Sequence, residues 1–291
     1  MSIDLLPKQT PSPLVEMRNI WKRFPGVIAN QAVDLDLLEG EVHALLGENG
    51  AGKSTLMYVL AGMYRPEAGT IRIAGEEMRF KSPSQAIGAG VGMVHQHFRL
   101  VEKMTAAENI HLGWGETPKI ISARDLVERT ERICRQFGLS VDPDARIWQL
   151  STGEQQRVEI LRVLARGARI LILDEPTSVL TPNEAVELFK VTRKLAEAGR
   201  TVVLITHKLD EVIAASDRVT VMRRGKVVAR RKTVSCDQAT LARLCIGEEL
   251  VSEAVGSKGS PGKALLEVNR ITVRENRNLP ALREISFTIR A

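Results

Sequence analysis

The loop from Gly47 to Thr55 most constrains what this chain can fold into, because it matches the phosphate-binding pattern G-x-x-x-x-G-K-S/T. The short run of residues 42–46 before it, which ends in two leucines, predicts a buried strand, and residues 53–61 after it predict a helix. Strand, loop and helix in this order are the context that the pattern requires, whereas a chance glycine-rich turn would not place a lysine and a serine in register. We therefore expect an α/β fold in which this loop binds a nucleoside triphosphate.

Each residue type in this loop suits a triphosphate bound with Mg²⁺. Glycines let consecutive backbone N–H groups turn inward as a nest for phosphate oxygens, and the start of the following helix adds partial positive charge. Lys53 is placed to reach the β- and γ-phosphates, and the Ser54 hydroxyl is placed to bind Mg²⁺. The residues predicted to hold the phosphates of ATP are Gly47, Asn49, Gly50, Gly52, Lys53, Ser54 and Thr55.

Two adjacent carboxylates end a second buried strand. Residues 170–173 are apolar and are followed by Asp174 and Glu175. Open α/β sheets bind their ligands at the carboxyl ends of parallel strands. Two acids at a strand end can also cap a helix, but a phosphate loop in the same chain favours a role in chemistry. We predict that Asp174 holds Mg²⁺ through water and that Glu175 orients or deprotonates the attacking water.

Length and composition indicate a soluble globular protein of one or two domains. The chain has 291 residues, of which 44% are hydrophobic and 26% are charged. It has no run of about 18 apolar residues, so no segment is expected to cross a membrane. Residues 1–13 lack the basic start and apolar core of an export signal and are predicted to be a loose leader. Three cysteines without metal-ligand spacing are typical of a reducing compartment.

The densest basic stretch of this chain, whose net charge is +6, lies in residues 223–232. Apolar residues flank it and Gly225 interrupts it, which predicts a two-stranded hairpin with solvated charges. A contact with anionic lipid headgroups or nucleic acid is the alternative, but no aromatic residues interleave with these charges, as base stacking needs. We expect no nucleic-acid partner.

Short apolar runs alternate with amphipathic segments from residue 42 onward, which predicts a mainly parallel sheet covered by helices. Pro182 behind Thr181 marks the start of one helix. Residues 99–150 interrupt the alternation and are expected to form a mostly helical subdomain inserted into the sheet domain. The expected strands are residues 42–46, 71–74, 91–94, 170–173, 202–205 and 219–222, and the expected helices are residues 53–61, 123–137, 154–164, 182–198 and 209–215.

An internal repeat has a separation that fits a duplicated domain. Residues 14–20 resemble residues 265–271 at an offset of 251, and residues 33–37 resemble residues 285–289 at an offset of 252. Chance likeness between strands is the alternative, but a Gly/Ser-rich stretch typical of a linker precedes the second copy. The expected organisation is a leader (1–13), a first domain (14–247), a linker (248–263) and the first strands of a second domain (264–291), whose phosphate loop would start near position 299, beyond Ala291.

Further motifs resemble those of the ATP-binding cassette (ABC) ATPases. Residues 150–157 are similar to the LSGGQ-type signature of that family and precede the acid-ending strand, as they do there. Gln96 is similar to the family's Q-loop glutamine, and His207 is similar to its switch histidine. Phe24 falls where the family has an aromatic residue that stacks on adenine. These motifs stand in the family's order over residues 14–247, and their combination is highly specific.

The resemblance implies an ABC cassette with a mainly parallel core sheet, an antiparallel β subdomain and an inserted helical subdomain. It also implies a sandwich dimer, in which the signature of one cassette contacts the nucleotide on the phosphate loop of the other through Ser151, Gly153 and Glu154. By the same resemblance Gln96 senses Mg²⁺ and the attacking water, and His207 contacts the γ-phosphate, so both are expected to act in catalysis.

Departures from the commonest motifs point to one branch of the family. Thr152 stands where glycine is commonest, and Glu154 stands where the family has a second small residue or glutamine. Thr181 stands where many members have aspartate, in the loop that touches the opposite site. These variants resemble those of importers for simple sugars and nucleosides, in which two cassettes are fused in one polypeptide. Residues 94–98 and 105–110 resemble the nucleoside-type branch.

The resemblance therefore implies the ATP-hydrolysing subunit of an importer, peripheral on the cytoplasmic face of the inner membrane. Its partners would be transmembrane permease subunits, a second cassette (the missing half or another copy) and, indirectly, an extracytoplasmic solute-binding protein. Phe98, Leu100, Val101 and Met104 are candidates for the permease contact, with packing inside their own subdomain as the alternative.

Two other interpretations fit parts of the pattern. A soluble tandem-cassette ATPase acting on ribosomes or nucleic-acid assemblies would also lack a membrane segment, but such relatives carry a long charged helical linker, whereas residues 248–263 are short and Gly/Ser-rich. A truncated, non-functional product is the third interpretation, because a single cassette hydrolyses ATP only if it finds a second one.

Overall fold

The computed structural model of the protein describes residues 12–118, 120–247, 262–274 and 280–290. The chain divides into two units, Met1–Glu248 and Glu249–Ala291, which are described separately. The predicted leader (except residues 12 and 13) and the predicted linker (except residues 262 and 263) lie outside the described residues.

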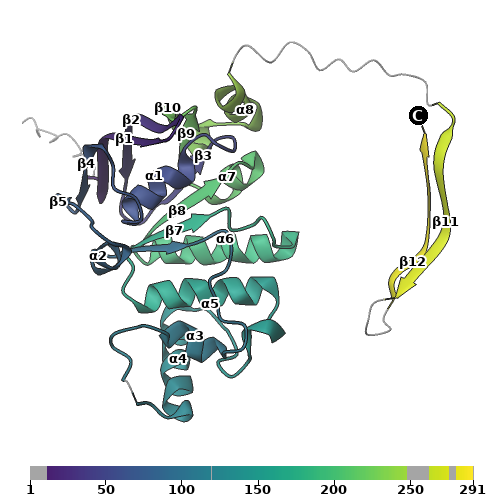
Figure 1. Ribbon diagram of the computed structural model, residues 1–291, viewed down its shortest axis with the longest axis horizontal. Helices are drawn as coiled ribbons and strands as arrows, with labels where there is room; N and C mark the ends of the chain where they lie inside the picture. The colour runs from purple at the N-terminus through teal and green to yellow at the C-terminus, as the bar shows by residue number, and fades with distance from the viewer. Residues whose placement is uncertain (1–11, 119, 248–261, 275–279, 291) are drawn as a thin grey trace, which may run out of the picture. The chain divides into compact units, whose positions relative to one another are not determined.

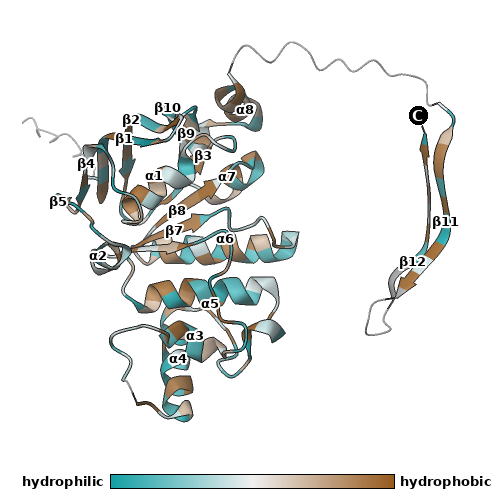
Figure 2. Ribbon diagram, viewed as in Figure 1, coloured by the Kyte–Doolittle hydropathy of each residue, from teal (hydrophilic) through white to brown (hydrophobic). Residues whose placement is uncertain are grey.

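A six-stranded sheet forms the centre of the first unit (Figure 1), with its strands in the order β10-β9-β3-β8-β7-β6. All neighbouring pairs are parallel except β10 with β9, so the predicted mainly parallel sheet is confirmed. The central strands are buried along their whole length and are apolar in Figure 2, as strands covered on both faces must be. The strands are β3 (Val42–Leu46), β6 (Val91–Val94), β7 (Ile170–Asp174), β8 (Thr201–Thr206), β9 (Arg218–Arg223) and β10 (Lys226–Lys232).

The N-terminal strands form a second, antiparallel sheet in the order β2-β1-β4-β5, which is the β subdomain that the resemblance implied. These strands are β1 (Val15–Phe24), β2 (Val27–Leu37), β4 (Ala68–Ile73) and β5 (Glu76–Met78). Much of β1 and β2 alternates buried apolar residues with more exposed ones, because one face of this sheet packs on the core and the other meets solvent.

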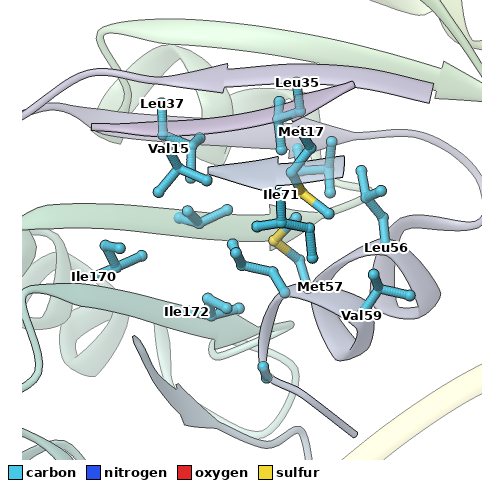
Figure 3. Close-up of a cluster of buried hydrophobic side chains, with 14 of the residues drawn as sticks. Val15, Met17, Leu35, Leu37, Leu56, Met57, Val59, Ile71, Ile170 and Ile172 are labelled. Atoms are coloured by element: carbon cyan, nitrogen blue, oxygen red, sulfur yellow. The ribbon is translucent and has the colours of Figure 1, made fainter. Parts of the chain in front are cut away.

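Helix α1 (Lys53–Leu60) packs in the apolar core between the two sheets (Figure 3). Its Leu56, Met57 and Val59 share one buried cluster with side chains of β1, β2 and β4, and with Ile170 and Ile172 of β7. Burial of each such side chain stabilises the folded state by about 1.5–3 kcal/mol. This packing fixes the direction of α1 and therefore holds its N-terminus, where the phosphate loop ends, at the carboxyl end of β3.

Helices α5 (Thr152–Ala165) and α6 (Pro182–Glu197) share a second apolar cluster with the central strands. Each begins in a capping box: the Ser151 hydroxyl accepts from the Glu154 amide, and the Thr181 hydroxyl accepts from the Glu184 amide, while each glutamate side chain accepts in return. Pro182 occupies the first turn of α6, as predicted.

The segment between β6 and α5 contains α3 (Ala106–His111), α4 (Ala123–Phe137) and the short 3₁₀ helix η1 (Ile147–Gln149). The prediction of a mostly helical segment over residues 99–150 is only partly right, since irregular stretches join these helices in the described residues. Glycines and prolines in those stretches disfavour helix. Helix α7 (Leu209–Ala215) has the predicted bounds, whereas α2 (Pro83–Gly88), η2 (Thr233–Ser235) and α8 (Gln238–Ile246) were not predicted.

The basic stretch forms the predicted hairpin. β9 and β10 pair in antiparallel register, and Arg224 and Gly225 turn the chain with φ of 49° and 75°. Two consecutive positive φ angles are typical of the tight turn that matches the twist of a two-stranded hairpin.

The second unit is an antiparallel hairpin of β11 (Ala264–Arg274) and β12 (Pro280–Arg290). It repeats two irregularities of β1 and β2. Asn19 and Ala32 have φ of 52° and 49°, and Arg270 and Glu284, which follow them by 251 and 252 residues, have φ of 47° and 48°. Positive φ is uncommon for residues other than glycine, so a shared pair of positions is a specific likeness between the two hairpins.

A buried ion pair closes the end of the central sheet opposite the phosphate loop. Glu41, just before β3, accepts hydrogen bonds from Arg218 at 3.1 and 3.2 Å and from the Leu38 amide at 2.9 Å, and it contacts His43 at 3.0 Å. Burial alone would raise the pKa of the Glu41 carboxyl, but the contacts with His43, Leu38 and Arg218 outweigh burial and lower it.

The substitution Glu41→Gln is expected to lower the melting temperature by roughly 5 °C at pH 7, because it leaves the Arg218 guanidinium without its counterion. Because the folded-state pKa lies below the ordinary value of 4.5, this stabilisation is complete above pH 4.5 and is lost as the pH falls through the folded pKa. The melting temperatures of the parent and of Glu41→Gln, measured from pH 7 to pH 3, should therefore converge at low pH. Glu39→Gln, at an exposed ion pair, is the control and should change the melting temperature by about 1 °C or less. A difference in melting temperature between the parent and Glu41→Gln that persists at pH 3 would contradict the stabilising role of the Glu41–Arg218 ion pair.

Candidate functional site

The phosphate loop joins β3 to α1 with the backbone that a nest requires. Gly50 and Gly52 have φ of 82° and 97°, which L side chains rarely adopt. A Cβ at Gly52 would lie 2.2 Å from the Ala29 carbonyl oxygen, and one at Gly47 would lie 2.3 Å from the Met222 carbonyl oxygen. Gly52 therefore needs glycine for both space and conformation, and Gly47 needs it for space.

Lys53 is buried inside this loop, with 5% of its surface exposed. Its Nζ donates to the carbonyl oxygens of Gly47 at 2.7 Å and Glu48 at 2.9 Å, so the ammonium braces the loop from within. Burial lowers the pKa of Lys53, and the nearby carboxylates of Glu175 and Asp174 partly oppose that shift. A lysine ammonium has three N–H donors, so these two hydrogen bonds leave one donor for a phosphate oxygen.

Asp174 meets the start of α1 at the end of β7. The Ser54 hydroxyl donates to Asp174 Oδ1 at 3.0 Å, and the Tyr58 hydroxyl lies 3.3 Å from Asp174 Oδ2. Burial raises the pKa of Asp174, and both hydrogen bonds lower it in part. A buried carboxylate and a hydroxyl at this distance are the oxygen donors that Mg²⁺ prefers, so the residues present fit that ion.

Glu175, Gln96 and His207 come together although they are far apart in the sequence. Gln96 Nε2 donates to Glu175 Oε2 at 3.2 Å, and His207 Nδ1 lies 3.2 Å from Glu175 Oε1. They follow the carboxyl ends of the adjacent strands β6, β7 and β8. The structure therefore places the three predicted catalytic side chains in one cluster beside Asp174.

An aromatic group lies at the end of β1. Phe24 is 38% exposed and packs edge-on against Tyr64, with ring centroids 5.4 Å apart. Lys22 Nζ lies 5.3 Å from the centre of the Phe24 ring and is held by an ion pair with Glu67 at 2.9 Å. A half-exposed ring anchored in this way offers a face on which a nucleobase can stack.

The predicted signature residues lie apart from the phosphate loop. Within the described chain, no hydrogen bond links Ser151, Gly153 or Glu154 to residues 47–55. Ser151 and Glu154 cap α5, and the Gly153 amide donates to Glu184 Oε1 of α6 at 3.1 Å. Asn49 and Thr55 lie in or beside the loop with no side-chain hydrogen bond to the described residues.

Three side chains in contact with this site were not predicted from the sequence. Tyr58 bonds Asp174, Glu184 bonds the Gly153 amide, and Glu211 bonds residues beside Glu175 and His207. Tyr58 and Glu184 sit in ordinary helical patterns, so only the distances reveal them. Glu211 had one available signal, its position four residues after His207 on a short helix.

Comparisons with known proteins support a single family. Residues 30–178 match the ABC transporter family. The chain is 45% identical to the "Guanosine import ATP-binding protein NupO" of Bacillus subtilis and 43% identical to the "Nucleoside import ATP-binding protein NupA" of Lactococcus lactis subsp. cremoris, in each case over 96% of this chain and 55% of the relative. It is 40% identical to the "Glucose import ATP-binding protein TsgD13" of Haloferax volcanii, over 97% of this chain and 56% of the relative. The chain thus spans about half the length of the curated relatives it matches.

Two solved ABC cassettes have the same fold as this chain. The ADP conformation of MJ1267, "an ATP-binding cassette of an ABC transporter", superimposes with a TM-score of 0.71 at 26% identity, over 82% of this chain and 97% of that one. The dimeric post-hydrolysis state of the cassette MJ0796, bound to ADP and Pi, gives a TM-score of 0.65 at 27% identity, over 75% of this chain and 98% of that one.

Proposed function

Because this chain belongs to the ABC transporter family of ATP-binding proteins, we propose that it binds and hydrolyses ATP to power an importer of a simple sugar or nucleoside. The observation that carries the proposal is the cluster at the carboxyl end of the central sheet. There a phosphate nest with a buried lysine lies beside Asp174, and Glu175 is held between Gln96 and His207. That arrangement suits phosphoryl transfer to water.

In the proposed reaction Glu175 orients a water molecule in line with the γ-phosphate. The water oxygen forms a bond to the γ-phosphorus, the bond from that phosphorus to the β–γ bridging oxygen breaks, and ADP and inorganic phosphate result. The Glu175 carboxylate accepts the water proton, while His207 and Lys53 contact γ-phosphate oxygens as charge develops. Mg²⁺, held by Ser54, Asp174 and Gln96, supplies charge neutralisation for the β- and γ-phosphates when bound.

The proposed active unit contains two cassettes. Ser151, Gly153 and Glu154 do not reach their own phosphate loop in the described residues, so we assign them to the nucleotide on a second cassette. The related cassette MJ0796 is dimeric in its structure bound to ADP and Pi, which supports a unit of two cassettes.

We propose that the second unit is the start of such a second cassette. Its hairpin repeats the positive φ angles of β1 and β2, and the amide of Arg270 bonds the Ser286 hydroxyl where the amide of Asn19 bonds the Asp34 carboxylate. The residues at equivalent places also differ in burial: Val15 and Leu35 are fully buried in the first unit, whereas Leu266 and Phe287 are 48% and 47% exposed. In a complete second cassette, the rest of the domain would cover these apolar side chains.

The proposed importer needs a partner that spans the membrane. Among the described helices, none has the length and hydrophobicity needed to span a bilayer. We propose a permease contact on the segment after Gln96, at the cytoplasmic face of the inner membrane. Of the four candidates, Val101 is 41% exposed, Leu100 packs against the apolar cluster that α5 and α6 share with the central strands, and Phe98 and Met104 are partly buried. Val101 is therefore the strongest candidate. The solute classes rest on the names of the relatives. An extracytoplasmic solute-binding protein is proposed as an indirect partner, as the family resemblance implies.

The proposal predicts that ATP turnover per chain rises with protein concentration, because two chains must meet to complete a site. We expect ATP binding at all concentrations and slow turnover in dilute, monomeric samples. The measurement pairs a phosphate-release assay with light scattering over a hundredfold range of concentration. Turnover that stays constant in samples shown to be monomeric would contradict the two-cassette site.

A further inference from the structure

Glu211 is a buried carboxylate that the proposed chemistry does not use. It lies in the first turn of α7 with 5% of its surface exposed. Its Oε2 accepts from the Thr206 hydroxyl at 2.7 Å, and its Oε1 accepts from the Thr177 hydroxyl and pairs with Lys208 Nζ at 3.0 Å. One side chain thus gathers three polar groups in a site where an unpaired carboxylate would be costly.

The residues that Glu211 holds flank the proposed catalytic side chains. Thr206 and Lys208 are the neighbours of His207, and Thr177 lies two residues after Glu175. Lys208 also bridges the two loops, since its Nζ lies 3.2 Å from the Thr177 hydroxyl. The Glu211 network is therefore a direct link between the loop that carries Glu175 and the loop that carries His207.

The backbone at Glu175 needs such a support. Glu175 has φ of 45°, in the left-handed region, and it precedes Pro176, although residues before proline prefer extended backbone. A conformation of this kind costs on the order of 1–3 kcal/mol and persists only where the surroundings hold it. The Glu175 amide donates to the Ile205 carbonyl at 3.0 Å, one residue before Thr206, so the network and the turn are anchored to the same strand end.

We infer that Glu211 is a positioning residue that sets the distance between Glu175 and His207 by tying together the ends of β7 and β8. It acts through the hydroxyls of Thr177 and Thr206 and touches neither nucleotide nor water. This inference rests on the proposed ATP hydrolysis for its catalytic consequence, but its structural part is independent of that reaction. A glutamate that merely favours the first turn of α7 is the competing explanation.

Hydrogen exchange of the full chain without nucleotide tests the structural part. In Glu211→Gln we expect the amides of Glu175, Ser178 and Lys208 to exchange at least about tenfold faster, while amides of the phosphate loop and α1 keep their protection. Glu41→Gln, a buried carboxylate at the other end of the sheet, is the matched control and should leave those three amides unchanged. Faster exchange confined to α7 would overturn the inference.

Kinetics test the catalytic part at protein concentrations that support turnover. Glu211→Gln should lower kcat about tenfold or more with the dissociation constant of ATP changed less than about threefold, because misplacing a reacting group affects turnover more than binding. Thr206→Val should lower kcat in the same direction, and combining it with Glu211→Gln should add little, since both changes break one network. A Glu211→Gln protein with unchanged kcat, or additive losses in the double variant, would contradict the inference. A parent chain without ATPase activity would remove the proposed function, and the exchange result would still decide the role of Glu211.

Discussion

Replacing Glu175 with glutamine is expected to abolish ATP hydrolysis while ATP remains bound. The amide keeps the size of the side chain and one acceptor for Gln96 or His207, but it cannot accept the proton of the attacking water. Loss of a general base costs about 10²- to 10⁴-fold in rate. We therefore expect kcat to fall at least about 100-fold and the dissociation constant of ATP to change less than about threefold, measured by phosphate release and by fluorescent-nucleotide binding.

Glu184→Gln is the matched control for this prediction. Glu184 is also a glutamate beside proposed site residues, but it contacts the Gly153 amide and Thr181 instead of the cluster around Asp174. It should retain far more turnover than Glu175→Gln. Hydrolysis by Glu175→Gln at the parent rate would remove Glu175 from the mechanism.

Replacing Lys53 with alanine is expected to have the largest effect on binding. The ammonium is the cation buried in the phosphate loop, and its two hydrogen bonds hold the carbonyl oxygens of Gly47 and Glu48 turned away from the nest. A lost charge-assisted contact of about 3 kcal/mol corresponds to roughly 100-fold weaker ATP binding. Isothermal titration calorimetry of the chain with ATP and Mg²⁺ measures the ATP affinity directly.

Lys190→Ala controls for the removal of a lysine. Lys190 pairs with Glu187 on the exposed side of α6, and its side chain is 62% exposed. We expect ATP affinity within about twofold of the parent, since exposed ion pairs contribute little. Equal ATP affinity in Lys53→Ala and Lys190→Ala would show that the loop does not bind the triphosphate as proposed.

Much of the fold could be predicted because its local signals agree with its tertiary structure. The apolar runs at β3 and β6 and the periodic segments at α4 and α7 have the predicted bounds, and Pro182 starts α6 where its fixed φ suits a helix. The helices α2 and α8 were missed because they are short and weakly patterned. The inserted segment was predicted to be more helical than it is, because its glycines and prolines were given too little weight.

The main residues of the site could be predicted from the sequence, but most of the residues that hold them in place could not. Motif spacing identified Lys53, Asp174 and Glu175, and strand order explains why Gln96 and His207 join them at one edge of the sheet. Tyr58 could not be predicted, because a hydrogen bond across 116 residues leaves no local pattern in the sequence. Glu211 had only its spacing from His207 as a signal, and its bond to Thr177 across 34 residues left none. The contact between Gly153 and Glu184 likewise depends on how α5 and α6 pack.

Complementation between two inactive variants tests the composite site most directly. Lys53→Ala disables the phosphate loop. Gly153→Asp disables the signature, because its Cβ would lie 2.7 Å from Glu184 Oε1 and its added negative charge would repel the partner's triphosphate. Each variant alone should hydrolyse no ATP, but in a mixed dimer the intact loop of one chain meets the intact signature of the other. With free exchange in a two-fold symmetric dimer, an equal mixture should recover about a quarter of the parent rate. A mixture that stays inactive, although mixed dimers are shown to form, would contradict a site shared between two cassettes.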